Sequence, residues 1–366
     1  MTIPVRNVYY LLCYAWRHLG GVDLVDAEEL DRMDHVHDLL GSILAEGTFR
    51  LVRRGVDRGY LERTQEVAGV RGKLEVGPTV KRALHTQGRT VCTVEEFSAD
   101  VLHNRILRST LQSLRASEGL DRHVREKVAL AWDKLDGVTA IPLRKHLFRQ
   151  VQLDRNQRAY RFLLSVCLLL FDSVLVGEGS GKVRFKDFRR DDNQMWRLFE
   201  DFALHFLQRE QDAFRIQGQT RFGWADQWGR TRLDENLIPS MRPDVIAESP
   251  ERRIILDTKF YREPLNRAPG GGSRLRSGHL YQIMAYLNNR EARRPEGPRH
   301  EGILLYASVG RRLRAELHLQ GFRVQARTVD LSRPWHEVRE EMLRVLGGGG
   351  KVGGVPVPSA HLASSP

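Results

Sequence analysis

Two short apolar segments on either side of a turn constrain the fold of this chain more than any other feature. The first segment is Val245-Ile246 and the second runs from Ile254 to Tyr261. Both have the composition of strands, and Ser249-Pro250-Glu251-Arg252 between them is typical of a turn. The sequence therefore predicts a β-hairpin that brings residue 244 alongside residue 257.

The predicted hairpin carries charged side chains within an apolar surrounding. Successive side chains of a strand alternate between its faces, so Asp257 and Lys259 share one face and Thr258 points the other way. Such charges are costly unless they pair or bind an ion. Asp244 and Asp257 supply the hard oxygen ligands that Mg²⁺ prefers, and Lys259 would lie near the attacking water or the scissile phosphate. This pattern indicates a metal-dependent phosphodiesterase; a surface hairpin with solvated charges is the alternative.

Two further segments carry candidate supporting residues. Downstream, a helix is predicted from apolar spacing at Leu280, Ile283, Met284 and Leu287. His279, Gln282 and Tyr286 fall on another face of that helix at i, i+3 and i+7, and we expect Gln282 and Tyr286 to support the site. An ordinary amphipathic helix with an outer polar face is the alternative. Upstream, Glu200 borders the apolar stripe of a predicted helix, either as a metal ligand or as a solvated helix charge.

Composition excludes several classes of protein. The chain has 366 residues, 41% of them hydrophobic and 28% charged, as in soluble globular proteins. We expect no secretory signal, because Arg6 and Asn7 interrupt the first apolar stretch. The longest apolar run, residues 162–176, is shorter than the roughly 20 residues of a membrane-spanning helix and predicts a buried helix. Three isolated cysteines suggest neither zinc nor disulfides and favour a cytoplasmic location.

The charge balance points to a polyanionic partner. The formal net charge is +12, and basic residues concentrate in residues 71–89, 144–161 and 182–190. Such patches follow a phosphate backbone with little sequence preference. Each of them alone could be a solvated face, but together with the paired aspartates they favour nucleic acid.

The order of predicted elements divides the chain into parts. Residues 1–155 read as an α+β domain, with helices near its start, Val-rich strands within residues 67–94, and helices at 102–114 and 124–135. Residues 156–346 read as a mixed sheet flanked by helices, and residues 347–366 as a disordered Gly/Pro/Ser tail. We therefore expect a mixed α/β protein with two domains. The glycine-rich residues 177–182 lack the spacing of a phosphate-binding loop, so nucleotide binding is not expected.

These motifs resemble known nuclease families. Pro243-Asp244 with Asp257-Thr258-Lys259 resembles the PD-(D/E)XK nuclease superfamily, and Gln282 with Tyr286 is similar to the Q-x-x-x-Y helix found in many of its members. Four blocks of the chain resemble the McrC family, the nuclease subunit of the McrBC restriction system. These blocks are residues 3–16, 69–75, 104–110 and 281–287.

The resemblance implies a division of labour. The N-terminal half would dock on an AAA+ GTPase ring, McrB, which reads methylcytosine, and would stimulate its GTPase. The C-terminal half would cleave DNA with Mg²⁺. Asp244, Asp257 and Lys259 match the family's catalytic positions. Related nucleases often place a glutamate on a preceding helix, but Glu200 matches no fixed position of the family and is left out of the catalytic set. Two other functions stay open, a stand-alone DNA-repair nuclease and a non-enzymatic adaptor that tethers a partner to DNA.

Overall fold

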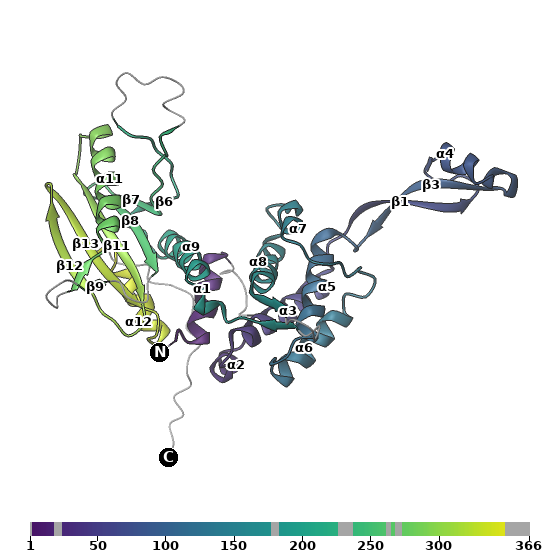
Figure 1. The fold of residues 1–366 in the computed structure, drawn as a ribbon, viewed down its shortest axis with the longest axis horizontal. Coiled ribbons are helices and arrows are strands. Elements are labelled where there is room, and N and C mark those ends of the chain that lie inside the picture. The colour runs from purple at the N-terminus through teal and green to yellow at the C-terminus, as the bar shows by residue number, and fades with distance from the viewer. Residues whose placement is uncertain are drawn as a thin grey trace, which may run out of the picture. The chain divides into compact units, whose positions relative to one another are not determined.

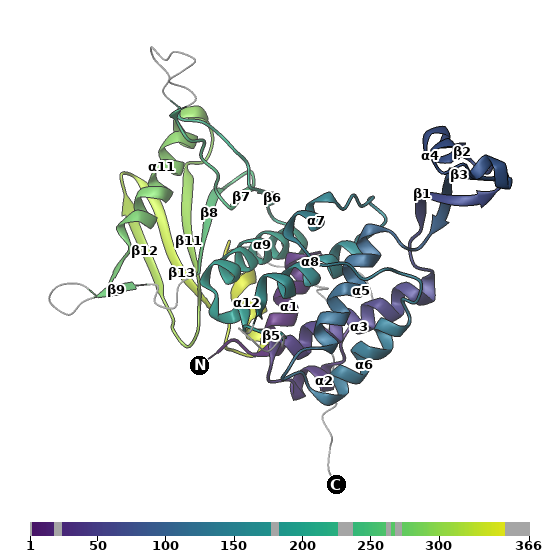
Figure 2. The same cartoon turned by 45° about the vertical axis from the view of Figure 1, so that its right-hand side comes forward.

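The computed structural model describes residues 2–17, 24–176, 183–225, 237–260, 265–267 and 273–347, which form two compact units (Figures 1 and 2). Unit 1 comprises Met1–Gly21, Ala27–Val36 and Asp187–Pro366; unit 2 comprises Val22–Asp26 and His37–Lys186. The units do not divide at the expected boundary between residues 155 and 156. The start of the chain instead belongs to the same unit as the predicted nuclease strands.

Unit 1 is built on a six-stranded sheet with the order β12-β13-β11-β8-β7-β6. Its strands are β6 (Arg215–Gly218), β7 (Val245–Glu248), β8 (Arg253–Phe260), β11 (His300–Ser308), β12 (Arg314–Leu319) and β13 (Phe322–Asp330). The central strands β8, β11 and β13 are parallel, whereas β12, β7 and β6 add to the sheet antiparallel. A separate pair consists of β9 (Leu265–Arg267) and β10 (Ser273–Leu275). The expected mixed α/β fold is confirmed.

The helices of unit 1 pack on this sheet and on one another. They are α1 (Val5–Ala15), α2 (Ala27–Arg32), α9 (Asp192–Glu210), α11 (Ser277–Arg293), α12 (Trp335–Leu343) and the short 3₁₀ helix η2 (Phe188–Arg190). In Figure 1, α11 lies against β8 and β11, and α9 runs beside β8 and β6. Helices therefore cover the strands that carry the predicted site residues.

The predicted hairpin is confirmed. β7 and β8 are antiparallel, with Val245 opposite Leu256. The next pair in this register is Asp244, just before β7, and Asp257 of β8. Ile254, Ile255 and Leu256 are fully buried, which explains why this apolar segment forms a central strand. Tyr261, predicted at the end of this strand, lies outside the described residues.

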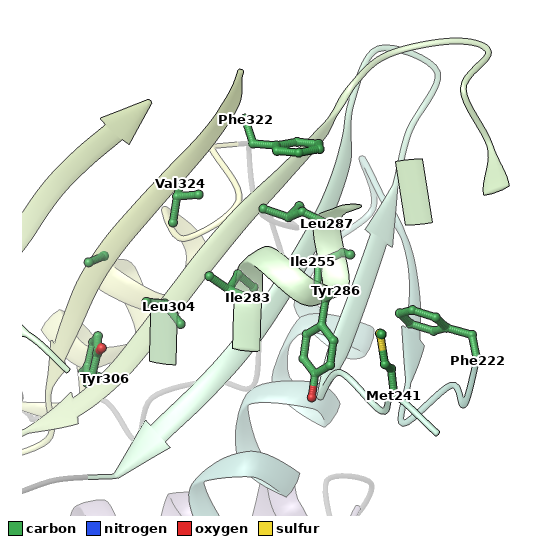
Figure 3. Close-up of a cluster of buried hydrophobic side chains, with 11 residues drawn as sticks. Phe222, Met241, Ile255, Ile283, Tyr286, Leu287, Leu304, Tyr306, Phe322 and Val324 are labelled. Carbon is green, nitrogen blue, oxygen red and sulfur yellow. The ribbon is translucent and has the colours of Figure 1, made fainter. Parts of the chain in front are cut away.

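A hydrophobic cluster joins α11 to the sheet (Figure 3). It contains Ile255 of β8, Ile283, Tyr286 and Leu287 of α11, and Leu304 and Tyr306 of β11, with residues of β13 and the bridge pair Phe222 and Met241. The helix lies close to β11 at Gly302. A Cβ added there would meet Ile283 Cγ1 at 2.9 Å and Leu287 Cδ1 at 3.0 Å. A larger residue at this position would require the side chains of Ile283 and Leu287 to shift.

The first helix is buried within unit 1. Tyr10 stacks on Trp335 of α12, with ring centroids 4.6 Å apart. The hydroxyl of Tyr14 donates to Glu210 Oε1 at 3.0 Å, and Arg339 donates to the other oxygen of that carboxylate at 2.7 Å. The aromatic residues of α1 are therefore explained by burial in the protein's own core, not by a docking surface.

Unit 2 combines helices with a long hairpin. Its helices are α3 (Val36–Arg54), α4 (Val76–Lys81), η1 (Leu84–Gln87), α5 (Leu102–Arg115), α6 (Arg122–Asp133), α7 (Lys145–Gln150) and α8 (Arg158–Ser173). Its strands are β1 (Gly59–Ala68), β2 (Lys73–Leu74), β3 (Arg89–Ser98), β4 (Val174–Val176) and β5 (Val183–Phe185). β1 and β3 pair along their whole length, so the Val-rich region predicted as short strands is largely one hairpin with a small helical tip.

Several other predictions can be compared with the structure. The buried helix expected within residues 162–176 begins earlier, at Arg158, and its last predicted residues form β4. Residues 177–182 and the predicted tail after Gly347 lie outside the described residues. Among the helices that the structure describes, none is long and apolar enough to cross a membrane.

Candidate active site

Asp244 immediately precedes β7 and is held by the neighbouring strand β8. Its Oδ2 accepts the backbone N–H of Thr258 at 2.7 Å and the Thr258 hydroxyl at 2.6 Å. Burial raises the pKa of Asp244, while the two bonds from Thr258 and the charges of Lys259 and Arg242 act in the opposite direction. The carboxylate is thus fixed in place but remains poorly solvated, with 8% of the residue exposed.

Asp257 and Lys259 meet on one face of β8, as the strand alternation predicts. The ammonium of Lys259 forms an ion pair with Asp257 Oδ2, and the two residues are 8% and 2% exposed, respectively. Burial raises the pKa of Asp257 to about 6; Lys259 lowers it and the negative charge of Asp244 raises it. The two aspartates therefore lie close enough for their charges to interact.

Gln282 and Tyr286 connect α11 to both parts of the hairpin. Lys259 Nζ donates to Gln282 Oε1 at 3.0 Å, and Gln282 Nε2 donates to the Tyr286 hydroxyl at 2.9 Å. That hydroxyl donates at 3.4 Å to the carbonyl of Arg242, which precedes Pro243-Asp244. Figure 3 shows the ring of Tyr286 within the hydrophobic cluster and its hydroxyl at the edge. The structure thus brings together all five residues that the sequence singled out for this site.

Glu200 of α9 was expected to be either a metal ligand or a solvated helix charge, and it is not fully solvated. It is half-buried, and Gln219 Nε2 donates to its Oε1 at 3.2 Å. The backbone N–H of Gln219 in turn donates to the Asp244 carbonyl at 3.2 Å. Burial, followed by the charges of Asp244 and Asp201, raises the pKa of Glu200 to about 7. The structure therefore adds a third acidic group to the electrostatic surroundings of Asp244.

His279 and Tyr306 form a second contact between α11 and the sheet. His279 Nδ1 lies 2.9 Å from the Tyr306 hydroxyl, and the two residues are 7% and 0% exposed. Burial and the charges of Lys259 and Arg276 lower the pKa of His279 to about 4, so its imidazole is neutral near pH 7. The sequence placed His279 on the helix face of Gln282 but assigned no role to His279 or to Tyr306.

The acidic groups fit a magnesium site that substrate completes. Mg²⁺ is usually bound by one or two carboxylates together with water and substrate phosphates. Within the described ranges, no three His, Cys, Asp or Glu side chains gather into a ready-made metal site. However, Asp244 and Asp257 are both buried with raised pKa values, and a nearby divalent cation would offset the cost of their charges. The donor set therefore suits a metal bound together with phosphate oxygens.

Basic side chains border the same region. Arg242 is exposed, and its charge lowers the pKa of Glu200, Asp201 and Asp244. Arg276 is the N-cap residue of α11, and Arg274 is exposed in β10. Residues 268–272, which precede these two arginines, lie outside the described residues.

Comparison with known proteins agrees with the fold and places the chain in a family. Residues 8–307 match the sequence model of the McrBC 5-methylcytosine restriction system component family. The type IV methyl-directed restriction enzyme EcoKMcrBC of Escherichia coli strain K12 is 30% identical over 349 residues, which cover 94% of this chain and 97% of that protein.

A solved structure shares the overall fold. It is the refined half-complex from a tetradecameric assembly of Thermococcus gammatolerans McrB AAA+ hexamers with bound McrC. The alignment has a TM-score of 0.50 at 18% identity and covers 92% of this chain and 75% of that chain. From the family match and the long alignment with the E. coli protein, it follows that this chain belongs to the McrBC family of 5-methylcytosine restriction system components.

Proposed function

We propose that this chain is the nuclease subunit of a modification-dependent restriction complex and hydrolyses DNA phosphodiester bonds with Mg²⁺. The observation that carries the proposal is the joint placement of Asp244, Asp257 and Lys259 at the β7–β8 hairpin of unit 1. A structural hairpin does not require two buried carboxylates with raised pKa values beside a buried lysine. Sites of this kind are typical of groups tuned for catalysis.

Asp244 and Asp257 would hold the metal. When bound there, Mg²⁺ supplies a Lewis acid for a phosphate oxygen and lowers the pKa of a bound water. The protein's own part is to present both carboxylates in fixed positions, Asp244 through Thr258 and Asp257 through Lys259. The PD-(D/E)XK resemblance of these residues supports this assignment.

Lys259 would stabilise negative charge that develops on the scissile phosphate or orient the attacking water. Its ammonium is fixed between Asp257 and Gln282 Oε1, so its direction is set before substrate arrives. The lysine side chain is flexible, so fixing it in advance reduces the conformational entropy that would otherwise be lost on reaching the transition state. Gln282 and Tyr286 therefore act as supports and not as reacting groups.

Unit 2 is the part of the chain that we assign to an AAA+ GTPase partner. The Thermococcus gammatolerans structure contains McrC bound to McrB AAA+ hexamers, which supports such a partner here. Since α1 is buried in unit 1, docking falls to residues 37–186. The β1–β3 hairpin of this unit exposes apolar residues suited to a protein contact, namely Tyr60, Val70, Val76, Val80 and Phe97.

Methylated plasmid cleavage by the purified chain, with and without an AAA+ GTPase encoded beside it, tests the proposal. We expect Mg²⁺-dependent cleavage only with the partner and with GTP, and loss of cleavage in Asp244→Ala, Asp257→Ala and Lys259→Ala. Glu296→Gln, at an exposed acidic position, is the matched control and should cleave normally.

The alternatives are separate outcomes of the same assay. Cleavage by the chain alone, equal with and without the partner, would favour a stand-alone repair nuclease. DNA binding without any metal-dependent cleavage, in complex or alone, would favour a non-enzymatic adaptor.

A further inference from the structure

Two residues on one face of α11 bond to directly opposed residues of two neighbouring strands. Gln282 accepts from Lys259 of β8, and His279, three residues earlier, bonds to Tyr306 of β11. Lys259 and Tyr306 are partners in the parallel β8–β11 register. Side chains at such positions point to the same face of the sheet, and neighbouring strands lie about 4.8 Å apart. The first turns of α11 thus rest on the sheet at two adjacent points.

The two contacts depend on each other. His279 and Gln282 lie on neighbouring positions of the helix surface, so the position of one fixes that of the other to within a fraction of a turn. The side chain of Lys259 is a flexible chain of four carbons, so the position of its ammonium group depends on where its acceptor, Gln282 Oε1, lies. The His279–Tyr306 bond thus attaches to β11 the same part of α11 that presents Gln282 to Lys259.

We propose that His279 and Tyr306 are positioning residues for Lys259: by fixing the first turn of α11 on β11, they hold Gln282, and through it the ammonium of Lys259, in the geometry needed for DNA cleavage. The inference rests on the proposed nuclease function and extends it to residues that make no contact with the reacting groups. The neutral state of His279 agrees with this role, since a second cation near Lys259 would repel the ammonium.

A merely structural role would make the other end of α11 equally important. There, Glu291 Oε2 accepts the backbone N–H of His300 at 3.1 Å and lies 2.5 Å from His300 Nδ1. This contact joins the same helix to the same strand β11, but far from Lys259. Glu291→Ala is therefore a matched control for loss of helix attachment without loss of lysine positioning.

The experiment compares Tyr306→Phe, His279→Leu, His279→Asn and Glu291→Ala in the full chain bound to its GTPase partner. Tyr306→Phe removes only a hydroxyl and His279→Leu removes the ring nitrogen, whereas His279→Asn keeps a polar atom near the position of Nδ1. Single-turnover DNA cleavage and DNA affinity are measured for each variant, with thermal unfolding as a check on folding.

We expect Tyr306→Phe and His279→Leu to lower the single-turnover rate by about tenfold without changing DNA affinity, as expected for misplacement of a reacting group. The two effects should not add in the double variant, because both substitutions remove the same His279–Tyr306 bond. His279→Asn should restore most of the rate, and Glu291→Ala should cleave like the wild type. Equal loss in Glu291→Ala and Tyr306→Phe, or an unchanged rate in both Tyr306→Phe and His279→Leu, would overturn the proposal.

A second readout separates this proposal from the proposed function. In chain labelled with ¹³C,¹⁵N-lysine, the side-chain signal of Lys259 is assigned by its absence in Lys259→Arg. That signal should shift in Tyr306→Phe and stay unchanged in Glu291→Ala, whether or not DNA is cut. If the wild-type complex fails to cleave DNA, the nuclease function fails; if cleavage is normal but the Lys259 signal is the same in Tyr306→Phe, the positioning role fails.

Discussion

The hydroxyl and the backbone N–H of Thr258 donate to one and the same carboxylate oxygen of Asp244, at 2.6 and 2.7 Å. Thr258 is fully buried and lies between Asp257 and Lys259 in sequence. β8 thus presents Asp257 and Lys259 on one face, and Thr258 between them holds Asp244. A three-residue segment of β8 organises the whole candidate site.

Thr258→Val tests this arrangement, because valine keeps the shape of threonine and removes the hydroxyl. Loss of that bond leaves the Asp244 oxygen with the backbone N–H alone and should destabilise unit 1 by about 1 kcal/mol. It should also raise the pKa of Asp244 further, since the hydroxyl bond lowers it. We expect a drop in cleavage rate of about tenfold at neutral pH, partly recovered at higher pH, whereas Thr258→Ser retains activity. A wild-type pH profile in Thr258→Val would show that the hydroxyl bond is irrelevant to the reaction.

Glu200 should make unit 1 less stable as pH rises. Its pKa in the fold, about 7, lies above the ordinary value of 4.5, so the native state binds more protons than the unfolded state between these values. Stability is therefore lost as pH rises from about 4.5 to 7. Because Glu200 is only half-buried, we expect Glu200→Gln to gain no more than about 1 kcal/mol at pH 8 and nothing at pH 4.5.

Thermal unfolding of both proteins in metal-free buffer checks this. The melting temperature of Glu200→Gln should exceed that of the wild type by about 2 °C at pH 8. Identical pH dependence in the two proteins would mean that the carboxyl group of Glu200 is ionised at no cost.

The N-terminal helix should be essential to the folding of unit 1. Tyr14→Phe removes one of the bonds to the buried carboxylate of Glu210 and should cost about 1 kcal/mol. Deletion of residues 1–17 removes the whole apolar helix and should abolish cooperative unfolding of unit 1. By contrast, replacing residues 37–186 with a flexible linker should leave unit 1 folded, since Arg189 bonds to the carbonyls of both Ile3 and Asp34 and holds these segments together. Soluble, cooperatively folded protein from residues 156–366 alone would argue against the observed division.

Duplex DNA binding by the isolated chain should be weak and steeply dependent on salt. The net charge of +12 provides the attraction, which acts on the phosphate backbone and not on particular bases. The logarithm of the affinity should fall with the logarithm of salt concentration by about 0.9 per phosphate neutralised. Fluorescence anisotropy with methylated and unmethylated duplexes of equal length measures it, and a clear preference of this chain alone for methylated DNA would place base recognition here and not in the partner.

The sequence predicted the local parts of the site well. Hairpin formation, the shared face of Asp257 and Lys259, and the helix carrying Gln282 and Tyr286 all follow from short-range periodicity. The role of Thr258 was missed because strand alternation points its side chain away from Asp257, and nothing local shows that Asp244 reaches across the strand end. The contact of His279 with Tyr306 depends on which strand lies under α11, and residue spacing does not encode this.

The division into units was also beyond local patterns. An apolar helix such as α1 must be buried, but its sequence does not tell whether its partner is the next helix or one some two hundred residues away. Tyr14 finds its partner at Glu210, and Asn7 donates to the carbonyls of Leu331 and Arg333. Such long-range contacts come from the packing of the whole unit.

The central claim is that the acids and lysine of the β7–β8 hairpin cut DNA, and cleavage of methylated plasmid by the complete complex with GTP and Mg²⁺ tests it most directly. Wild type and Asp257→Ala are compared at equal GTPase stimulation and equal DNA binding, so that partner docking is controlled. The account predicts cleavage by the wild type, none by Asp257→Ala, and none by either protein when Mg²⁺ is replaced by a chelator. Cleavage by Asp257→Ala at the wild-type rate would contradict it.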